Sequence, residues 1–93
     1  MSSEKINFNK LERVTKGYSN HRRIEMMFLL KNKPELSLID VVRELNINFK
    51  TASEHMRRLT IAGLIIKRHD GNSVRHKLTT QGETILKFLR TLE

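Results

Sequence analysis

The sequence of 93 residues contains no cysteine and only one proline, Pro34. Without cysteine the chain has no disulfide, thiolate metal ligand or thiol nucleophile. It also lacks a membrane span, because its longest purely apolar run, Met26–Leu30, is far shorter than the ~20 residues that a spanning helix needs. The segment Met1–Lys5 lacks the apolar core of a secretory signal. Together these absences predict a cytoplasmic protein with no membrane partner.

Patterns for catalysis or metal binding are missing as well. The chain contains no Ser–His–acid order, no glycine-rich phosphate loop and no paired carboxylates in a plausible pocket, and a chain this short has little room for a lined cleft. The four histidines show no ligand spacing on a common helical face. His69 and His76 could meet across a hairpin, but two imidazoles do not make a zinc site. We therefore predict no enzymatic activity, no cofactor and no metal site.

Basic residues, in contrast, are abundant. The chain has 18 Lys and Arg against 10 Asp and Glu, a net charge of +8 at pH 7. On so short a chain this excess predicts a polyanionic partner, with nucleic acid as the first choice and an anionic membrane surface as the second. Residues 50–77 hold seven of the basic residues and only two acids. The alternative is a solvated surface on which the charges cluster by chance.

Periodicity and turn residues predict a mainly helical domain with a small β-hairpin. Ser37 is expected to cap a short helix in which Ile39, Val42 and Leu45 face inward. After Gly63 the period changes from 3.6 to 2, with Leu64 and Ile66 on one side of a strand. The predicted order is helix, helix, helix, turn, helix, strand, strand, helix, with the middle elements over about residues 20–31, 38–45, 49–62, 64–69 and 73–78. The first helix follows a cap at Asn7 or Asn9 and runs to about residue 16, and the last follows a cap at Thr79 or Thr80 and runs to about residue 92. Two short helices joined by a tight turn and followed by a hairpin form a winged helix-turn-helix, here a single domain spanning residues 1–93.

The helix over residues 49–62 has two different faces. At 100° per residue, Ala52, Met56 and Leu59 fall on one side, which we expect to be buried. Lys50 and Arg57 fall on the opposite side, with small hydroxyl residues flanking them near the N-terminal end. Such a helix fits a DNA major groove about 12 Å wide. The alternative is an ordinary amphipathic surface helix.

Residues 51–65, TASEHMRRLTIAGLI, resemble the recognition helix of the ArsR and MarR winged-helix repressors. Those repressors share the pattern T-x-S-x-H-L, two residues, L, two residues, A-G-L-[VI], from which only Met56 departs. The segments KRHDGN (67–72) and LTTQG (78–82) resemble the wing and the start of the last helix. The resemblance covers about residues 20–82 and implies sequence-specific binding of double-stranded DNA by a homodimer. It leaves any small-molecule effector unknown.

The resemblance also assigns residues to the two interfaces. Residues 49–62 would enter the major groove, and the wing, residues 64–78, would lie on the backbone or in the minor groove. The implied DNA-binding residues are Lys50, Thr51, Ser53, Glu54, His55, Arg57, Arg58, Lys67, Arg68, Asn72 and Arg75. For His55, whose angle places it at least half buried, a packing role is an equal alternative. The first and last helices would form the dimer interface through Phe8, Leu11, Val14, Ile85, Phe88, Leu89 and Leu92. Alternatively, these apolar residues complete the core of the monomer.

One departure from the family bears on metal binding. Metal-sensing ArsR members carry E-L-C-V-C-D-L where this chain has ELSLIDV, so Ser37 and Ile39 replace both cysteines. The last helix also has no histidine. These differences agree with the prediction of no metal site.

Two other functions stay open at this stage. One is an architectural protein that coats DNA with little sequence preference, which the charge of +8 fits equally well. The other is a winged-helix module for protein–protein contact. The leading hypothesis is a dimeric transcriptional regulator, a repressor by its resemblance, that binds a palindromic operator.

Overall fold

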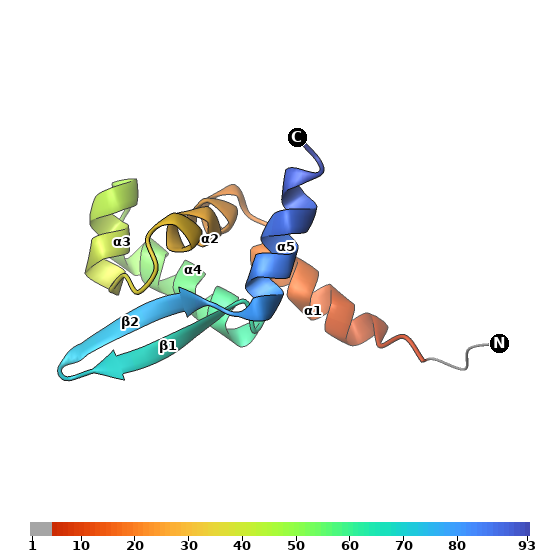
Figure 1. The fold of residues 1–93 in the computed structure, drawn as a ribbon, viewed down its shortest axis with the longest axis horizontal. Coiled ribbons are helices and arrows are strands. Elements are labelled where there is room, and N and C mark those ends of the chain that lie inside the picture. Colours follow the sequence, from red (N-terminus) through yellow and green to blue (C-terminus); the bar gives the residue numbers. More distant parts are fainter. Residues whose placement is uncertain (1–4) are drawn as a thin grey trace.

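A computed structural model describes residues 5–93, so the prediction about a signal segment at Met1–Glu4 lies outside the described residues. The elements follow the predicted order (Figure 1), and their ends lie within about two residues of the predicted ones. They are α1 (Phe8–Tyr18), α2 (His21–Asn32), α3 (Leu38–Leu45), α4 (Phe49–Ile61), β1 (Ile65–Asp70), β2 (Ser73–Leu78) and α5 (Thr80–Arg90). The fold is a mainly helical winged helix-turn-helix, as predicted. Within residues 5–93 no helix is long and apolar enough to cross a membrane.

Each helix begins at a side chain that caps its first turn. The caps are Asn7, Asn20, Ser37, Asn48 and Thr79, and each side-chain oxygen accepts a hydrogen bond from a backbone N–H of the first turn. At α3 the Ser37 hydroxyl accepts from the Asp40 N–H, while the Asp40 carboxylate accepts from the Ser37 N–H. Such a reciprocal capping box fixes the start of a short helix.

Left-handed residues set the turns on either side of α4. Asn46 ends α3 with φ of 51°, and Gly63 follows α4 with φ of 77°. Asparagine and glycine adopt this conformation more readily than other residues. The chain between α3 and α4 is therefore only three residues long, 46–48, which keeps the two helices in contact.

The core lies where α2, α3 and α4 meet the base of the hairpin and α5. It is formed by Met26, Met27, Leu30, Val41, Ala52, Met56, Leu59, Leu64, Ile65, Leu78 and Leu86. The central helix contributes three of these, since Met26, Met27 and Leu30 of α2 are each at most 1% exposed. The helix α2 therefore lies at the centre of the fold.

One residue predicted to face inward is exposed instead. Ile39 is 43% exposed, because the inward stripe of α3 runs through Val41 at its buried centre. Ile66 is 55% exposed, because β1 begins at Ile65 and turns that residue toward the core opposite Leu78. For α3 the helical period was right, and only the phase of the inward stripe differs from the prediction.

The loop before α3 holds the hairpin in place. The backbone of His76 in β2 pairs with Leu36, with the His76 N–H donating to the Leu36 carbonyl at 2.9 Å. The Glu35 N–H donates to the His76 carbonyl at 3.0 Å, and the His76 Nδ1 lies 3.0 Å from the Leu36 oxygen. This isolated β-bridge fixes the hairpin against the helix-turn-helix.

Two glycines allow α1 and α5 to pack closely on this framework. A Cβ atom on Gly17 of α1 would overlap the Cβ of Ala62, which follows α4. A Cβ atom on Gly82 of α5 would overlap the carbonyl oxygen of Leu64 at the base of the hairpin. Both terminal helices are thus held by contacts that a larger residue would prevent.

Candidate nucleic-acid interface

Between Phe49 and Ile61, every exposed residue of α4 is polar or charged. Ala52, Met56 and Leu59 are buried on the inward side, as the periodicity predicted. The opposite side exposes six of the predicted DNA-binding residues, which we call the α4 face: Lys50, Thr51, Ser53, Glu54, Arg57 and Arg58. The arrangement presents hydroxyls and cations on a stiff helix, supported from behind by α2 and α3.

A single carboxylate organises two arginines on the α4 face. Arg57 donates to Glu54 from Nε at 3.0 Å and from Nη2 at 2.7 Å, and Arg58 donates from Nε at 3.0 Å. These hydrogen bonds, first from Arg57 and then from Arg58, lower the pKa of Glu54 to about 2. Glu54 is therefore ionised at neutral pH and holds both guanidinium groups in defined positions. Among the described residues, Lys50 forms no such ion pair.

His55 lies apart from the α4 face. It is only partly exposed, and its Nδ1 is buried with no hydrogen-bond partner among residues 5–93. Burial lowers the pKa of His55, and the positive charge of Arg23 on α2 lowers it further. His55 is thus neutral at physiological pH, and its position agrees with the packing role that the sequence left open.

The wing brings its basic residues together beside the loop at Glu35. Arg68 and Arg75 are directly opposite each other in the hairpin register. Arg68 donates to the Glu35 carboxylate at 2.8 Å, and Arg75 donates to the Glu35 backbone oxygen at 3.1 Å and to Asp70 at 3.3 Å. Lys67 and Asn72 are exposed on the same hairpin. Arg68 and Arg75 are therefore oriented by a loop that is distant in the sequence, whereas Lys67 and Asn72 have no such contact with it in the described part of the chain.

Sequence reasoning missed Glu35 as part of this surface. Its backbone has a positive φ of 70°, and both its carboxylate and its carbonyl oxygen bind wing arginines. No local pattern marks such a residue, since its partners are 33 and 40 positions away. His69 and His76 are not opposite each other in the hairpin, because the register places Val74 opposite His69 and Lys67 opposite His76.

Large apolar side chains remain exposed at the other end of the molecule, on α1 and α5. Of the predicted dimer residues, Phe8, Leu11, Phe88 and Leu92 are exposed, whereas Val14, Ile85 and Leu89 are half-buried and pack against the core. The monomer core therefore accounts for some of this set but leaves four side chains open to water.

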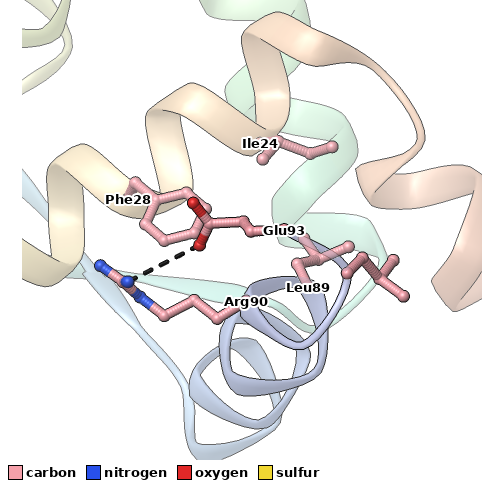
Figure 2. A pocket seen from close by; sticks show the side chains of 6 residues that line it. Ile24, Phe28, Leu89, Arg90 and Glu93 are labelled. Atoms are coloured by element: carbon pink, nitrogen blue, oxygen red, sulfur yellow. Dashed lines mark ion pairs between the residues drawn. The ribbon is translucent and has the colours of Figure 1, made fainter.

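The same end is hollowed between α2 and α5. A cavity of about 560 Å³ is lined by Ile24, Phe28, Leu89 and Leu92, with two charged residues as its polar members (Figure 2). The Arg90 guanidinium lies 5.6 Å from the centre of the Phe28 ring and 3.7 Å from the Glu93 carboxylate. Within residues 5–93 no three His, Asp or Glu side chains come together as metal ligands.

Comparison with known proteins places these features in a family. Residues 20–67 match the ArsR family of bacterial regulatory proteins. This segment runs from the cap of α2 to β1 and includes all of the α4 face. No curated protein matches the chain.

Solved structures of other regulators have the same fold. The homodimeric winged helix-turn-helix DNA-binding domain of a possible ArsR-family transcriptional regulator from Mycobacterium bovis superposes with a TM-score of 0.83 at 20% identity, covering 99% of this chain and 89% of that one. The transcriptional regulator HlyU from Vibrio vulnificus superposes with a TM-score of 0.74 at 26% identity, covering 92% of this chain and 90% of that one. The transcriptional repressor BigR from Xylella fastidiosa superposes with a TM-score of 0.76 at 20% identity, covering 90% of this chain and 83% of that one.

Proposed function

Because the chain belongs to the ArsR family and is a DNA-binding transcriptional regulator, we propose that it represses transcription by binding a specific operator as a homodimer. Proteins of this family are typically not enzymes. The observation that carries the proposal is the α4 face, an exposed row of hydroxyls and cations on a helix whose other side is locked into the core.

The α4 face has the chemistry to read base edges in the major groove. Arginine and lysine donate to guanine O6 and N7, and a carboxylate accepts from the cytosine amino group. Lys50 and Arg57 are the donors nearest the middle of the face, and Glu54 between them is the acceptor. Thr51 and Ser53 add hydroxyls that suit either bases or phosphates. We therefore assign direct readout to Lys50, Glu54 and Arg57.

The wing contacts the backbone or the minor groove in this proposal. Arg68 and Arg75 are held side by side by Glu35, while Lys67 and Asn72 lie exposed on the same hairpin. Phosphate contacts of this kind position a protein on the duplex without reading its sequence. A pre-oriented pair of arginines suits this role because less side-chain freedom is lost on binding.

The homodimer would form through the apolar end. Phe8, Leu11, Phe88 and Leu92 are each more than half exposed, and so many large apolar side chains open to water are unusual for a small monomer. The Mycobacterium bovis domain with the same fold is described as homodimeric. A two-fold dimer presents two copies of α4 to a palindromic operator, with half-sites about one helical turn or a small multiple apart.

The repressor assignment is supported by BigR, which shares the fold and is described as a transcriptional repressor. A dimer bound across two half-sites covers about two turns of DNA. When such a site overlaps a promoter, the bound dimer excludes the polymerase. We propose this simple occlusion for the present chain.

The test begins with capture of genomic DNA fragments from a bacterial library by the purified protein, followed by sequencing. For a captured fragment, affinity should exceed that for a mixed-sequence duplex by about 10³-fold or more at matched salt. A ratio near one for every fragment would favour an architectural protein that coats DNA.

Substitution then tests the α4 face directly. The double variant Lys50→Ala, Arg57→Ala should weaken operator binding by at least about tenfold, since a good base contact contributes about 1–3 kcal/mol. Lys10→Ala with Lys87→Ala removes the same charge from exposed positions on α1 and α5 and serves as the control. Equal losses in both variants would show that net charge alone acts, and undiminished binding would place the interface elsewhere on the chain.

A further inference from the structure

A basic cleft lies between α1 and the C-terminal half of α4. The two helices approach closely where Gly17 meets Ala62, and beside this crossing the surface is hollowed to about 270 Å³. The cleft, which we call the α1–α4 cleft, is lined by Arg13, Lys16, Gly17, Arg57, Arg58, Ile61 and Ala62. Its walls thus carry two cations from each helix. The predicted DNA-binding set contains the two on α4 but neither of the two on α1.

The positive charge of this cleft is only partly neutralised within the molecule. Lys16 pairs with Glu12 at 2.9 Å, and Arg57 and Arg58 share Glu54. Arg13 forms no ion pair in the described part of the chain. Four cations are therefore matched by two carboxylates, both of which are exposed.

Arg23 of α2 lies close enough to Arg58 to be affected by its positive charge. Arg23 of α2 has its Nε buried with no hydrogen-bond partner among residues 5–93. Burial lowers the pKa of Arg23, and the charge of Arg58 lowers it further. Arg23 does not line the cleft, and Glu54 offsets part of the positive charge around it, so Arg23 shows only that Arg58 adds positive charge on this side of α4.

We propose that the α1–α4 cleft binds backbone phosphates of the DNA duplex, so that α4 is flanked by a second backbone-binding element besides the wing. This inference rests on the proposed function, since it extends the same interface. Figure 1 shows α1 and the tip of the hairpin pointing toward opposite ends of the molecule. Arg13 and Lys16 are the residues that this proposal adds.

Continuity with the α4 face identifies the ligand as DNA. Arg57 belongs both to the α4 face and to the cleft, so a duplex lying on that face continues toward α1. The cleft is open to solvent between exposed cations, which suits a phosphodiester strand that passes across it. Exposed ion pairs contribute little to stability, so phosphates can displace Glu12 from Lys16 and Glu54 from Arg58, while Arg57 keeps its proposed base contact.

The experiment measures how DNA affinity depends on salt. The double variant Arg13→Gln, Lys16→Gln is compared with the wild type on a mixed-sequence duplex of about 30 base pairs, or three helical turns. Each lost phosphate contact lowers the slope of log K against log salt by about 0.9, so we expect a fall of about 2. The variant Glu12→Gln should change affinity in the opposite direction, because it releases Lys16.

Matched controls separate the cleft from net charge and from folding. The variant Lys10→Gln, Lys87→Gln removes two exposed cations outside the cleft and should change the slope by much less. Helical circular dichroism and sedimentation show whether the fold and the oligomeric state are retained. An unchanged slope in the α1 variant, or an equal fall in the control, overturns this inference alone. Absence of salt-dependent binding by the wild type overturns the proposed function and this inference with it.

Discussion

The inward side of α4 is covered by the rest of the chain, although Phe49, Ile61 and Ile66 on α4 and the hairpin are exposed, whereas the terminal helices α1 and α5 leave several large apolar side chains open to water. On α4, Met56 and Leu59 are at most 2% exposed. On the terminal helices, Phe8 is 73% exposed and Phe88 is 51% exposed. Both ends are built from amphipathic helices, so the difference lies in what covers the apolar side.

The comparison separates two kinds of apolar residue that composition does not distinguish. A residue such as Leu59 is covered within the chain and contributes to folding. A residue such as Phe88 is covered only if another molecule is present, and it then contributes to assembly. Charged residues divide in the same way, since Glu54 positions arginines whereas Lys50 is free to meet a ligand.

The largest effect is expected at the covered end. Leu59→Ala leaves a cavity at the centre of the core and should lower the free energy of unfolding by about 2–5 kcal/mol. Denaturant unfolding measures this free energy. Lys50→Ala, on the outward side of the same helix, is the control and should change it little. A loss of less than about 1 kcal/mol would mean that α4 is not locked into the core.

A smaller effect, on assembly, is expected at the exposed end. Phe88→Ser with Leu92→Ser should raise the dissociation constant of the dimer at least tenfold, since burying each side chain contributes about 1.5–3 kcal/mol. Sedimentation equilibrium measures the constant, and helical circular dichroism should stay unchanged because both side chains are exposed in the single chain. A wild type that is monomeric at tens of micromolar would refute the dimer.

The smallest expected effect is a dependence of the free energy of unfolding on pH, through His76, which attaches the wing to the loop before α3. His76 is 4% exposed, and burial lowers its pKa despite the hydrogen bond to Leu36, with the charge of Lys67 lowering it further. Below about pH 6.5 the unfolded chain binds a proton that the folded chain excludes, so the free energy of unfolding falls as the pH falls. His55, whose pKa is also lowered by burial, adds to the same trend.

Unfolding midpoints measured between pH 7.5 and about 5 test this dependence. His76→Asn keeps an N–H donor for the Leu36 oxygen but cannot be protonated, so its midpoint should depend less on pH than that of the wild type. His69→Gln, on the exposed part of the same hairpin, is the control and should keep the wild-type dependence. Identical pH profiles for His76→Asn and the wild type would contradict the assignment to His76.

Much of the fold could be predicted because its signals are local. The cap at Ser37 and the left-handed turn at Gly63 depend on atoms within a few residues, and each marks a helix end in the sequence. The buried and exposed sides of α4 follow from its period, so Lys50, Glu54 and Arg57 could be placed outward correctly. The phase of a short helix is defined by few residues, which is why Ile39 was placed on the inward side although it is exposed.

By itself, therefore, the sequence determined the order of the elements and the outward residues of α4, since caps, turn residues and periodicity are local signals. The family was indicated by the resemblance of residues 51–65 to a known pattern. Only the tertiary structure decided that Glu35 orients Arg68 and Arg75, and that Arg13 and Lys16 share a cleft with Arg57. It also decided which apolar side chains of α1 and α5 remain exposed. The physical reason is that these contacts join residues far apart in the chain, and their existence depends on how whole helices pack.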